Sequence, residues 1–314
     1  MLETLQKLRA HRTLEGDRLA AALFRKAQNG APGSSEARPI ALGEGWRVVD
    51  IVCTYGPGDQ PFEEHFLATS ISLVLAGSFI YRSVRGAALM APGALMLGNC
   101  GSAYECSHQH GEGDRCLSFQ FQPELFERIA RDAGAKRAIL DNHCLPPLRE
   151  LAQLTALASM AALPAVQGPS VRCGLLEEIA LELAGRVVSI GCDASTGVKT
   201  EHVRDARRIA LVLRRMEASS EQCVSIAELA DEAGLSPYRF LRAFKRATGI
   251  TPHQWLLRTR LRHAAERLVA CHDAITEIAL DVGFDDLSNF IRSFRAEFGV
   301  SPRKYRSAKR QKTC

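Results

Sequence analysis

The sequence predicts an α+β chain: a small antiparallel β-barrel with flanking helices in the N-terminal part, and an all-α C-terminal part in which a long helix joins two helix-turn-helix units. Two observations support this prediction. Between residues 40 and 121, apolar and polar residues alternate and glycine recurs every eight to twelve residues, which is typical of many short strands. Between residues 225 and 305, one helical pattern occurs twice, so that Ile226 recurs as Ile275 and Phe240 recurs as Phe290.

Composition and charge limit what the chain can be. Its 314 residues, of which 46% are hydrophobic, are enough for about two domains. Residues 201–314 carry 21 lysines and arginines against 14 aspartates and glutamates, which leaves 19 against 21 for the rest of the chain. The excess positive charge therefore lies in the C-terminal part, where it favours a phosphate-bearing partner such as nucleic acid.

Ten cysteines would suit a secreted, disulfide-linked protein, but the N-terminal residues do not. The segment from Met1 to Gln28 is charged throughout and lacks the apolar centre of a signal peptide, and no run of 18 apolar residues occurs in the chain. We therefore expect a soluble, cytoplasmic protein with reduced thiols and no membrane partner.

Residues 1–39 are expected to form a helical arm followed by a breaker-rich stretch. Leucine and alanine recur at three and four residues from Leu2 to Ala27, and glycine, proline and serine then gather between Asn29 and Pro39. Residues 40–122 follow as the predicted barrel, with strands expected at 46–52, 70–75, 78–81 and 94–97.

Helical periodicity returns in residues 123–190, which we expect to form a layer beside the barrel. Leu175, Ile179, Leu183 and Val187 form one apolar stripe, and this stripe suits two roles. It either packs on the chain's own barrel or contacts a second copy of the chain in a dimer. Residues 191–200 are the predicted linker to the C-terminal domain, residues 201–314.

The N-terminal residues with the richest chemistry lie between Cys106 and Cys116. On a strand, Cys106, His108 and His110 share one face, and the glycine-rich residues that follow are predicted to form a hairpin turn. If His110 pairs with Arg115, this face points to the apolar interior and Cys116 lies on the other face. If His110 pairs with Cys116, all four side chains converge on a polar face. The sequence is compatible with both registers.

These side chains have three interpretations. Thiols and imidazoles are ligands for Zn²⁺ or another thiophilic metal, and the candidate ligands are Cys106, His108, His110, Cys116 and His65. The same thiols are also able to react with an oxidant or an electrophile. In the third interpretation, the histidines are hydrogen-bonded strand residues and the cysteines are small packing residues.

Each copy of the C-terminal repeat has the pattern helix, tight turn, helix. In the first copy, Ser225 and Glu228 have the capping-box spacing, Gly234 supplies the turn, and Ser236 begins the second helix. That helix buries phenylalanines and leaves a polar face outward, which in the two copies comprises Tyr238, Arg239, Arg242 and Lys245, and Leu287, Ser288, Asn289 and Arg292. Arginine and asparagine on such a face can read guanine and adenine in the major groove.

A continuous helical pattern from His253 to Cys271 connects the two units. At 1.5 Å per residue this helix would be about 27 Å long. It would hold the two units at a fixed separation, so that they enter successive major grooves on one side of the DNA. The sequence therefore predicts that residues 201–314 form a domain that binds double-stranded DNA.

The doubled motif, the connecting helix and the closing run of residues 283–306 resemble the AraC/XylS family of bacterial transcription regulators. The resemblance covers residues 205–306. It implies base-reading roles for Tyr238, Arg239 and Arg242 in the first unit and for Leu287, Ser288, Asn289 and Arg292 in the second. Leu287 replaces a polar residue often found in the family, which favours contact with a thymine methyl group. The resemblance further implies a cupin-like effector domain, a homodimer and contact with RNA polymerase.

These features predict a transcription regulator, an activator by family resemblance, controlled by a small molecule or metal sensed in the N-terminal barrel. The alternative is a metal-dependent cupin enzyme fused to a DNA-binding domain, with His65, His108 and His110 as ligands. Such an enzyme usually needs a carboxylate and a later histidine at fixed barrel positions, whereas Glu112 lies in the turn and His143 lies beyond the strands. We therefore expect no enzymatic activity.

Overall fold

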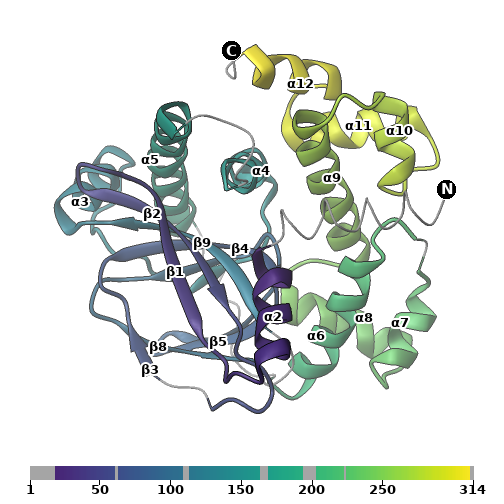
Figure 1. Ribbon diagram of the computed structural model, residues 1–314, viewed down its shortest axis with the longest axis horizontal. Coiled ribbons are helices and arrows are strands. Elements are labelled where there is room, and N and C mark those ends of the chain that lie inside the picture. Colours follow the sequence, from purple (N-terminus) through teal and green to yellow (C-terminus); the bar gives the residue numbers. More distant parts are fainter. Residues whose placement is uncertain are drawn as a thin grey trace.

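The computed structural model has a β-rich N-terminal half and a helical C-terminal half, at the left and right of Figure 1. The structure describes residues 18–60, 63–108, 113–162, 169–193, 203–222 and 224–311. Most of the predicted helical arm and of the predicted linker lies outside these ranges.

The described strands form two antiparallel sheets, and the larger sheet has six strands. In spatial order these are β1 (Ser35–Gly43), β2 (Trp46–Cys53), β9 (Asp114–Phe121), β4 (Thr69–Gly77), β7 (Leu95–Gly98) and β10 (Cys144–Leu145). Because β9 lies between β2 and β4, it is buried along almost its whole length. Val48, Ile71 and Leu117 are fully buried where the sheet packs against helices.

The smaller sheet has the order β3 (Glu63–His65), β8 (Ala103–Ser107), β5 (Phe79–Ser83) and β6 (Gly86–Met90). Successive side chains of β5 point to opposite faces of the sheet. Phe79 and Tyr81 pack in an apolar cluster with Met96 of the larger sheet, so they face the space between the sheets. Ile80 points the other way and joins the core of the C-terminal helices.

Helices of the N-terminal half cover the larger sheet. They are α2 (Arg18–Asn29), α3 (Pro123–Asp132), the short 3₁₀ helix η1 (Arg149–Leu151), α4 (Ala152–Ala161) and α5 (Pro169–Asp193). On α5, Ile179, Leu183 and Val187 are buried in one core with the sheet. The predicted stripe therefore packs on the chain's own sheet and is not available to a second copy of the chain.

The C-terminal half consists of helices in which one pattern occurs twice. They are α6 (Val203–Ala218), α7 (Ile226–Glu232), α8 (Pro237–Thr248), α9 (Pro252–Ala270), α10 (Ile275–Asp281), α11 (Leu287–Phe298) and α12 (Pro302–Gln311). α10 repeats α7, and α11 repeats α8. The connection from α10 to α11 is longer by a single residue than the connection from α7 to α8, so the insertion that separates the two copies lies in this turn.

Local signals in the sequence fix the ends of these helices. The Glu228 amide donates to the Ser225 hydroxyl and the Ser225 amide donates to the Glu228 carboxylate, so the capping box at the start of α7 is confirmed. Asp286 caps α11 by accepting two amide hydrogen bonds. α8 and α11 end at Gly249 and Gly299, which adopt the left-handed conformation at φ values of 77° and 75°.

The two halves contact each other through β5, β6 and α4. Ile80 joins the core that contains α6 and α8, and Ala156 of α4 joins the core around α9, α10 and α11. Arg149 donates a hydrogen bond to the carbonyl of Ala296 in the last turn of α11. We call the contact made by these residues the seam. Through it, the N-terminal half touches both copies of the helical repeat.

The sheets extend beyond the predicted barrel, residues 40–122. β1 begins at Ser35, inside the predicted breaker-rich stretch, and β10 lies in the predicted helical layer. Pro39 is compatible with β1 because this is an edge strand whose register shifts after Pro39. Within the part of the chain that the structure describes, no helix has both the length and the apolar character needed to cross a membrane.

Candidate nucleic-acid interface and N-terminal pocket

The second helix of the first repeat, α8, presents a cationic face to solvent. Its period buries Phe240 completely and leaves Tyr238, Arg239, Arg242 and Lys245 exposed, as predicted from the sequence. The Arg242 guanidinium carbon lies 5.8 Å from the centre of the Tyr238 ring, which is a cation–π separation. Arg242 remains exposed beside this ring.

The equivalent helix of the second repeat, α11, presents polar side chains at its N-terminal end. Asp286 accepts hydrogen bonds from the amides of Ser288 at 3.1 Å and Asn289 at 2.8 Å, and so holds the first turn. Ser288, Asn289 and Arg292 are exposed. Leu287 is half-buried against the core of the second repeat, so it is the least accessible of the predicted base-reading residues.

Between the two repeats, one guanidinium fixes the turn of the second repeat. Arg260 of α9 donates to the carbonyls of Ser220 at 2.6 Å, Gly283 at 2.7 Å and Gln222 at 2.9 Å. Gly283 has φ of 94°, and a Cβ atom there would lie 2.5 Å from the carbonyl oxygen of Glu221. Only glycine fits this turn without displacing the loop after α6.

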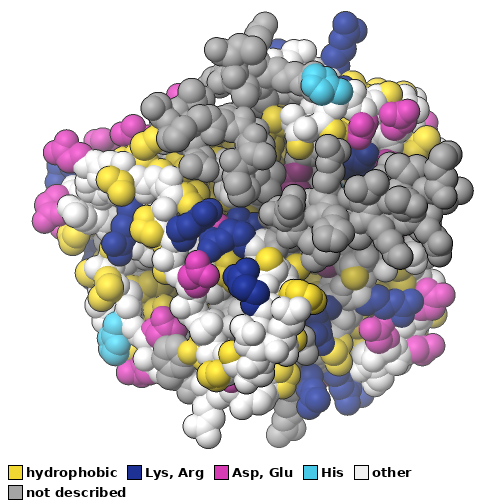
Figure 2. All heavy atoms as spheres, in the orientation of Figure 1, with side chains coloured by type: hydrophobic (Ala, Val, Ile, Leu, Met, Phe, Trp, Pro, Cys, Tyr) yellow, Lys and Arg dark blue, Asp and Glu magenta, His cyan; other side chains and the backbone are white. Residues whose placement is uncertain are grey.

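Positive charge is present on the surface of the helical half but is mixed with negative charge. In Figure 2, lysine and arginine side chains lie over the region of α6, α7 and α8 at the lower right, beside carboxylates. Some of these charges are paired within the chain: Arg215 with Glu232 at 2.7 Å and Arg246 with Asp205 at 3.5 Å. Among the described arginines of α8, Arg239 and Arg242 have no ion pair in the structure, which leaves their charge for a partner.

A cavity of about 470 Å³ lies in the N-terminal half, with walls from both sheets. This volume is in the range of small-molecule sites. Phe79 and Met96 supply apolar wall, and Ser72, Ser118 and Gln120 supply hydroxyl and amide groups. The cavity is therefore suited in size and lining to a small ligand.

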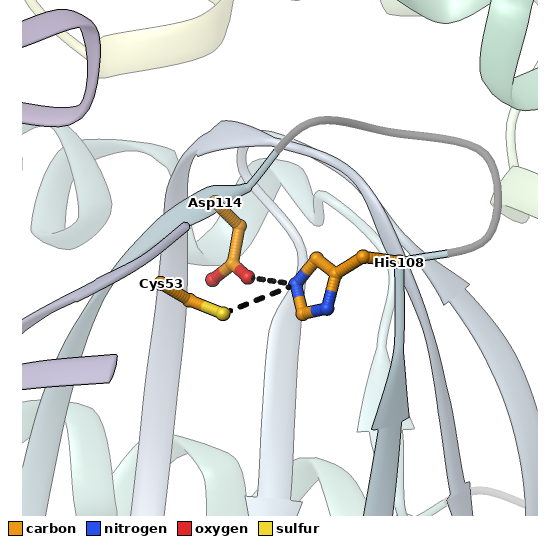
Figure 3. Close-up of side chains that lie close together, drawn as sticks. All are labelled: Cys53, His108 and Asp114. Carbon is orange, nitrogen blue, oxygen red and sulfur yellow. Dashed lines mark hydrogen bonds and ion pairs between the residues drawn. The ribbon is translucent and has the colours of Figure 1, made fainter. Parts of the chain in front are cut away.

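Three buried side chains meet at the wall of this pocket (Figure 3). Cys53 ends β2, Asp114 begins β9 directly opposite it, and His108 follows β8 of the other sheet. His108 Nε2 lies 2.5 Å from Asp114 Oδ1 and 3.5 Å from Cys53 Sγ. All three residues are at most 8% exposed. The ends of two strands of the larger sheet and the residue that follows a strand of the smaller sheet are thus brought to one point.

The cysteines of the pocket are poor nucleophiles as they stand. Burial, and then the neighbouring Asp114 charge, raises the pKa of the Cys53, Cys106 and Cys116 thiols well above the ordinary value. These thiols are therefore protonated at neutral pH, whereas reaction with an oxidant or electrophile needs the thiolate. In this buried state the thiols of Cys106 and Cys116 are less reactive than an exposed thiol would be.

The predicted hairpin between Cys106 and Cys116 is wrong in both of its registers. β8 pairs with β3 and β5, whereas β9 pairs with β2 and β4 in the other sheet. The chain therefore passes from one sheet to the other after Ser107. β9 fills the centre of the larger sheet, where both of its edges are already hydrogen-bonded, so it has no free edge for β8.

The candidate metal ligands are only partly brought together. Cys106, His108, Cys116 and His65 all line the pocket, but of these only His108 belongs to the closest cluster. The His65 side chain is 57% exposed on β3, and its Nε2 lies 4.0 Å from a carboxylate oxygen of Glu63. His110 lies outside the described residues.

The other two members of the cluster carry only weak signals in the sequence. Cys53 ends an apolar strand early in the chain, and Asp114 lies in the glycine-rich run that we assigned to a turn. Only the pairing of β2 with β9 places them opposite each other. The spacing of these three residues along the sequence therefore does not match a known metal-binding motif.

Comparisons with known proteins found a family model and several relatives. A family model described as a helix-turn-helix domain matches residues 229–308. The HTH-type transcriptional activator RhaS of Escherichia fergusonii is 30% identical over 170 residues, which cover 54% of this chain and 57% of RhaS. The Transposon Tn10 TetD protein of Escherichia coli is 36% identical over 98 residues, which cover 31% of this chain and 71% of TetD.

Among solved structures, a probable AraC family transcriptional regulator from Rhodopseudomonas palustris is 30% identical. That match covers 32% of this chain and 96% of the other, with a TM-score of 0.31. The chain spans little more than half the length of RhaS.

Proposed function

Because the chain belongs to the AraC/XylS family of transcription regulators, we propose that it binds double-stranded DNA through α8 and α11 and activates transcription in response to a ligand held in the N-terminal pocket. The main support is the pair of exposed faces: Arg242 and Arg292 lie at equivalent positions of the repeat, and both are exposed over a buried phenylalanine core. α9 joins the two reading helices, so one polypeptide would read two half-sites.

The assignment of contacts follows the side-chain chemistry. Arg242 and Arg292 would donate paired hydrogen bonds to guanine, and Asn289 would pair with adenine. Arg239 and Lys245 suit phosphates, and Leu287 suits a thymine methyl group at the margin of the interface because it is half-buried. Activation, contact with RNA polymerase and dimerisation are part of the same proposal, supported by family membership.

The pocket and the seam support regulation by a ligand. A ligand changes DNA binding only if it binds one arrangement of the two repeats better than another. Here the N-terminal half contacts both repeats through Ile80, Ala156 and Arg149, so its packing influences their relative placement. The ligand would be a small molecule or a metal ion.

Replacement of the two arginines tests the reading helices. Arg242→Ala and Arg292→Ala should each weaken binding at a site selected from a random DNA library by about 1–3 kcal/mol, because each removes a paired contact with a base. Each should also relax base preference at one position only. Fluorescence anisotropy and repeated site selection measure both effects.

Arg25→Ala is the matched control, since Arg25 is an exposed arginine on α2, which belongs to the N-terminal half and not to the helical repeat. The Arg25→Ala variant should bind the selected DNA site with the same affinity as the unmodified chain. If both reading-helix variants keep the original affinity and footprint, the assignment of α8 and α11 is wrong.

A further inference from the structure

We propose that Cys53, His108 and Asp114 bind a thiophilic divalent cation, with Zn²⁺ as the ion that fits best. This inference rests on the proposed function because it names the ligand class of the pocket. The donor atoms of the three residues all lie within 4.8 Å of one another. A thiolate, an imidazole and a carboxylate are all established zinc donors, and the thiolate selects against Mg²⁺ and Ca²⁺.

The spacing of the donors fits tetrahedral zinc. With Zn–S near 2.3 Å and Zn–N near 2.0–2.1 Å, sulfur and nitrogen ligands of one ion lie about 3.5 Å apart. The distance between Cys53 Sγ and His108 Nε2 is 3.5 Å. The His108–Asp114 contact is shorter, at 2.5 Å, because it is a hydrogen bond. A bound ion would take the place of this bond, and the carboxylate would move back by less than about 1 Å.

The charges of the site balance on binding. His108 would present the lone pair of Nε2 to the ion and carry its proton on Nδ1, and Cys53 would release its thiol proton to solvent. One doubly charged cation with one thiolate and one carboxylate gives a neutral site. Neutrality matters here because an unbalanced charge at this depth would be costly. The cation also stabilises the thiolate that burial alone opposes.

Neighbouring groups orient the donors. The Cys116 thiol donates to Asp114 Oδ2 at 3.2 Å, which is the kind of outer contact that sets the direction of a metal-bound carboxylate. The rings of Tyr55 and Phe79 lie 6.3 and 5.6 Å from the His108 ring and flank it. The three donors also line the cavity, so the fourth coordination position opens toward it and can hold water or a small ligand.

Cobalt provides a direct test with the full-length chain. Co²⁺ added to metal-free protein should bind at one equivalent per chain, with the visible bands of tetrahedral cobalt and a thiolate-to-cobalt charge-transfer band. Zn²⁺ should displace it and remove both signals. Cys53→Ser should abolish the charge-transfer band, and His108→Gln should weaken Co²⁺ binding at least about 100-fold, because loss of even an outer partner costs 10–100-fold.

Two variants serve as controls because they keep the cluster intact. Cys100→Ser removes an exposed thiol, and His65→Gln removes an exposed imidazole at the pocket. Both should bind Co²⁺ as the unmodified chain does. The inference is overturned if the unmodified chain shows no charge-transfer band, or if Cys53→Ser keeps it.

Folding and function are separated from metal binding by two further measurements. Circular dichroism shows whether each variant folds. If Cys53→Ser does not fold, the near-isosteric Asp114→Asn takes its place. Asp114→Asn should lose Co²⁺ affinity, and an unchanged Co²⁺ affinity would overturn the site. DNA binding of the unmodified chain is measured with Zn²⁺ and with a chelator. DNA binding without any cobalt signal would refute only the metal site, whereas a cobalt signal without DNA binding in either condition would refute only the proposed function.

Discussion

Among the single residues, Asp50 is a fully buried carboxylate that is held by arginines from two other elements. Arg115 of β9 binds both of its oxygens at 3.0 Å, and Arg18 of α2 lies 2.7 Å from Oδ2. Burial on its own would raise the pKa of Asp50, but the hydrogen bonds and charge of Arg115, and then of Arg18, hold this pKa below its usual value. The Asp50 carboxylate therefore links the larger sheet to α2 through Arg18.

Removing this carboxylate should destabilise the fold strongly. Asp50→Ala leaves Arg115, which is 6% exposed, without its counter-charge, so we expect a loss of about 3–5 kcal/mol in the free energy of unfolding. Glu36→Ala is the control, because Glu36 also pairs with Arg18 but is exposed, and it should cost at most about 1 kcal/mol. Urea unfolding at neutral pH measures both. Equal losses would contradict this account of Asp50.

His263 of α9 should make the stability of the chain depend on pH. Burial, and then the charge of Arg262, lowers its pKa to about 4. The unfolded chain takes up a proton near pH 6.5 that the folded chain does not, so stability should fall by about 1–3 kcal/mol as the pH drops from about 6.5 toward 4. His263→Gln should remove this part of the pH dependence. Urea unfolding across this range compares the two chains, and identical slopes would refute the prediction.

The candidate residues differ in how far sequence alone could predict them. Tyr238, Arg242 and Arg292 were predictable as exposed because the helix period is local and the phenylalanines between them define the buried side. Cys53 and Asp114 were not, because they become neighbours only through strand pairing between residues far apart in the chain. The exposure of His65 was not predictable either, because strand period does not say which strands are central and which lie at an edge.

The same distinction holds at the scale of elements. The capping box at Ser225 and the left-handed Gly249 and Gly299 mark helix ends by nearest-neighbour chemistry, so the helices of the repeat agree closely with their predicted positions. The strands were recognisable, but their order was not. A short loop after a strand favours a hairpin, whereas β9 instead completes the larger sheet between β2 and β4.

For the whole molecule, the seam reaches both repeats but holds them by different contacts, with β5 and β6 on the first repeat and α4 on the second. Gly249 and Gly299 occupy equivalent positions, at the ends of α8 and α11, and both have positive φ. A Cβ atom at Gly249 would lie 2.7 Å from Pro146 of the N-terminal half, whereas at Gly299 nothing lies within 4 Å. The first repeat is thus held more closely at this point.

Alanine at these two glycines should therefore have unequal effects. Both substitutions carry the strain of a left-handed alanine, about 1–2 kcal/mol. Gly249→Ala must also displace Pro146, so it should cost about 1–3 kcal/mol more and speed hydrogen exchange in the segment around Pro146. Gly299→Ala should leave that exchange unchanged. Urea denaturation measures the loss of stability, and hydrogen exchange with mass spectrometry measures the exchange rate around Pro146. Equal stability losses and equal exchange rates in the two variants would contradict a close contact at Gly249.

β5 lies directly between the cavity and the core of the first helical repeat. Within this five-residue strand, Phe79 lines the cavity and its immediate neighbour Ile80 packs in the core of α6 and α8. A molecule that displaces the Phe79 ring would therefore also shift Ile80, which packs beneath α8, because no flexible residue separates the two side chains. Under the proposed regulation, a molecule that fits the cavity yet leaves Phe79 in place would bind without changing DNA binding, so ligand affinity and transcriptional response would vary independently.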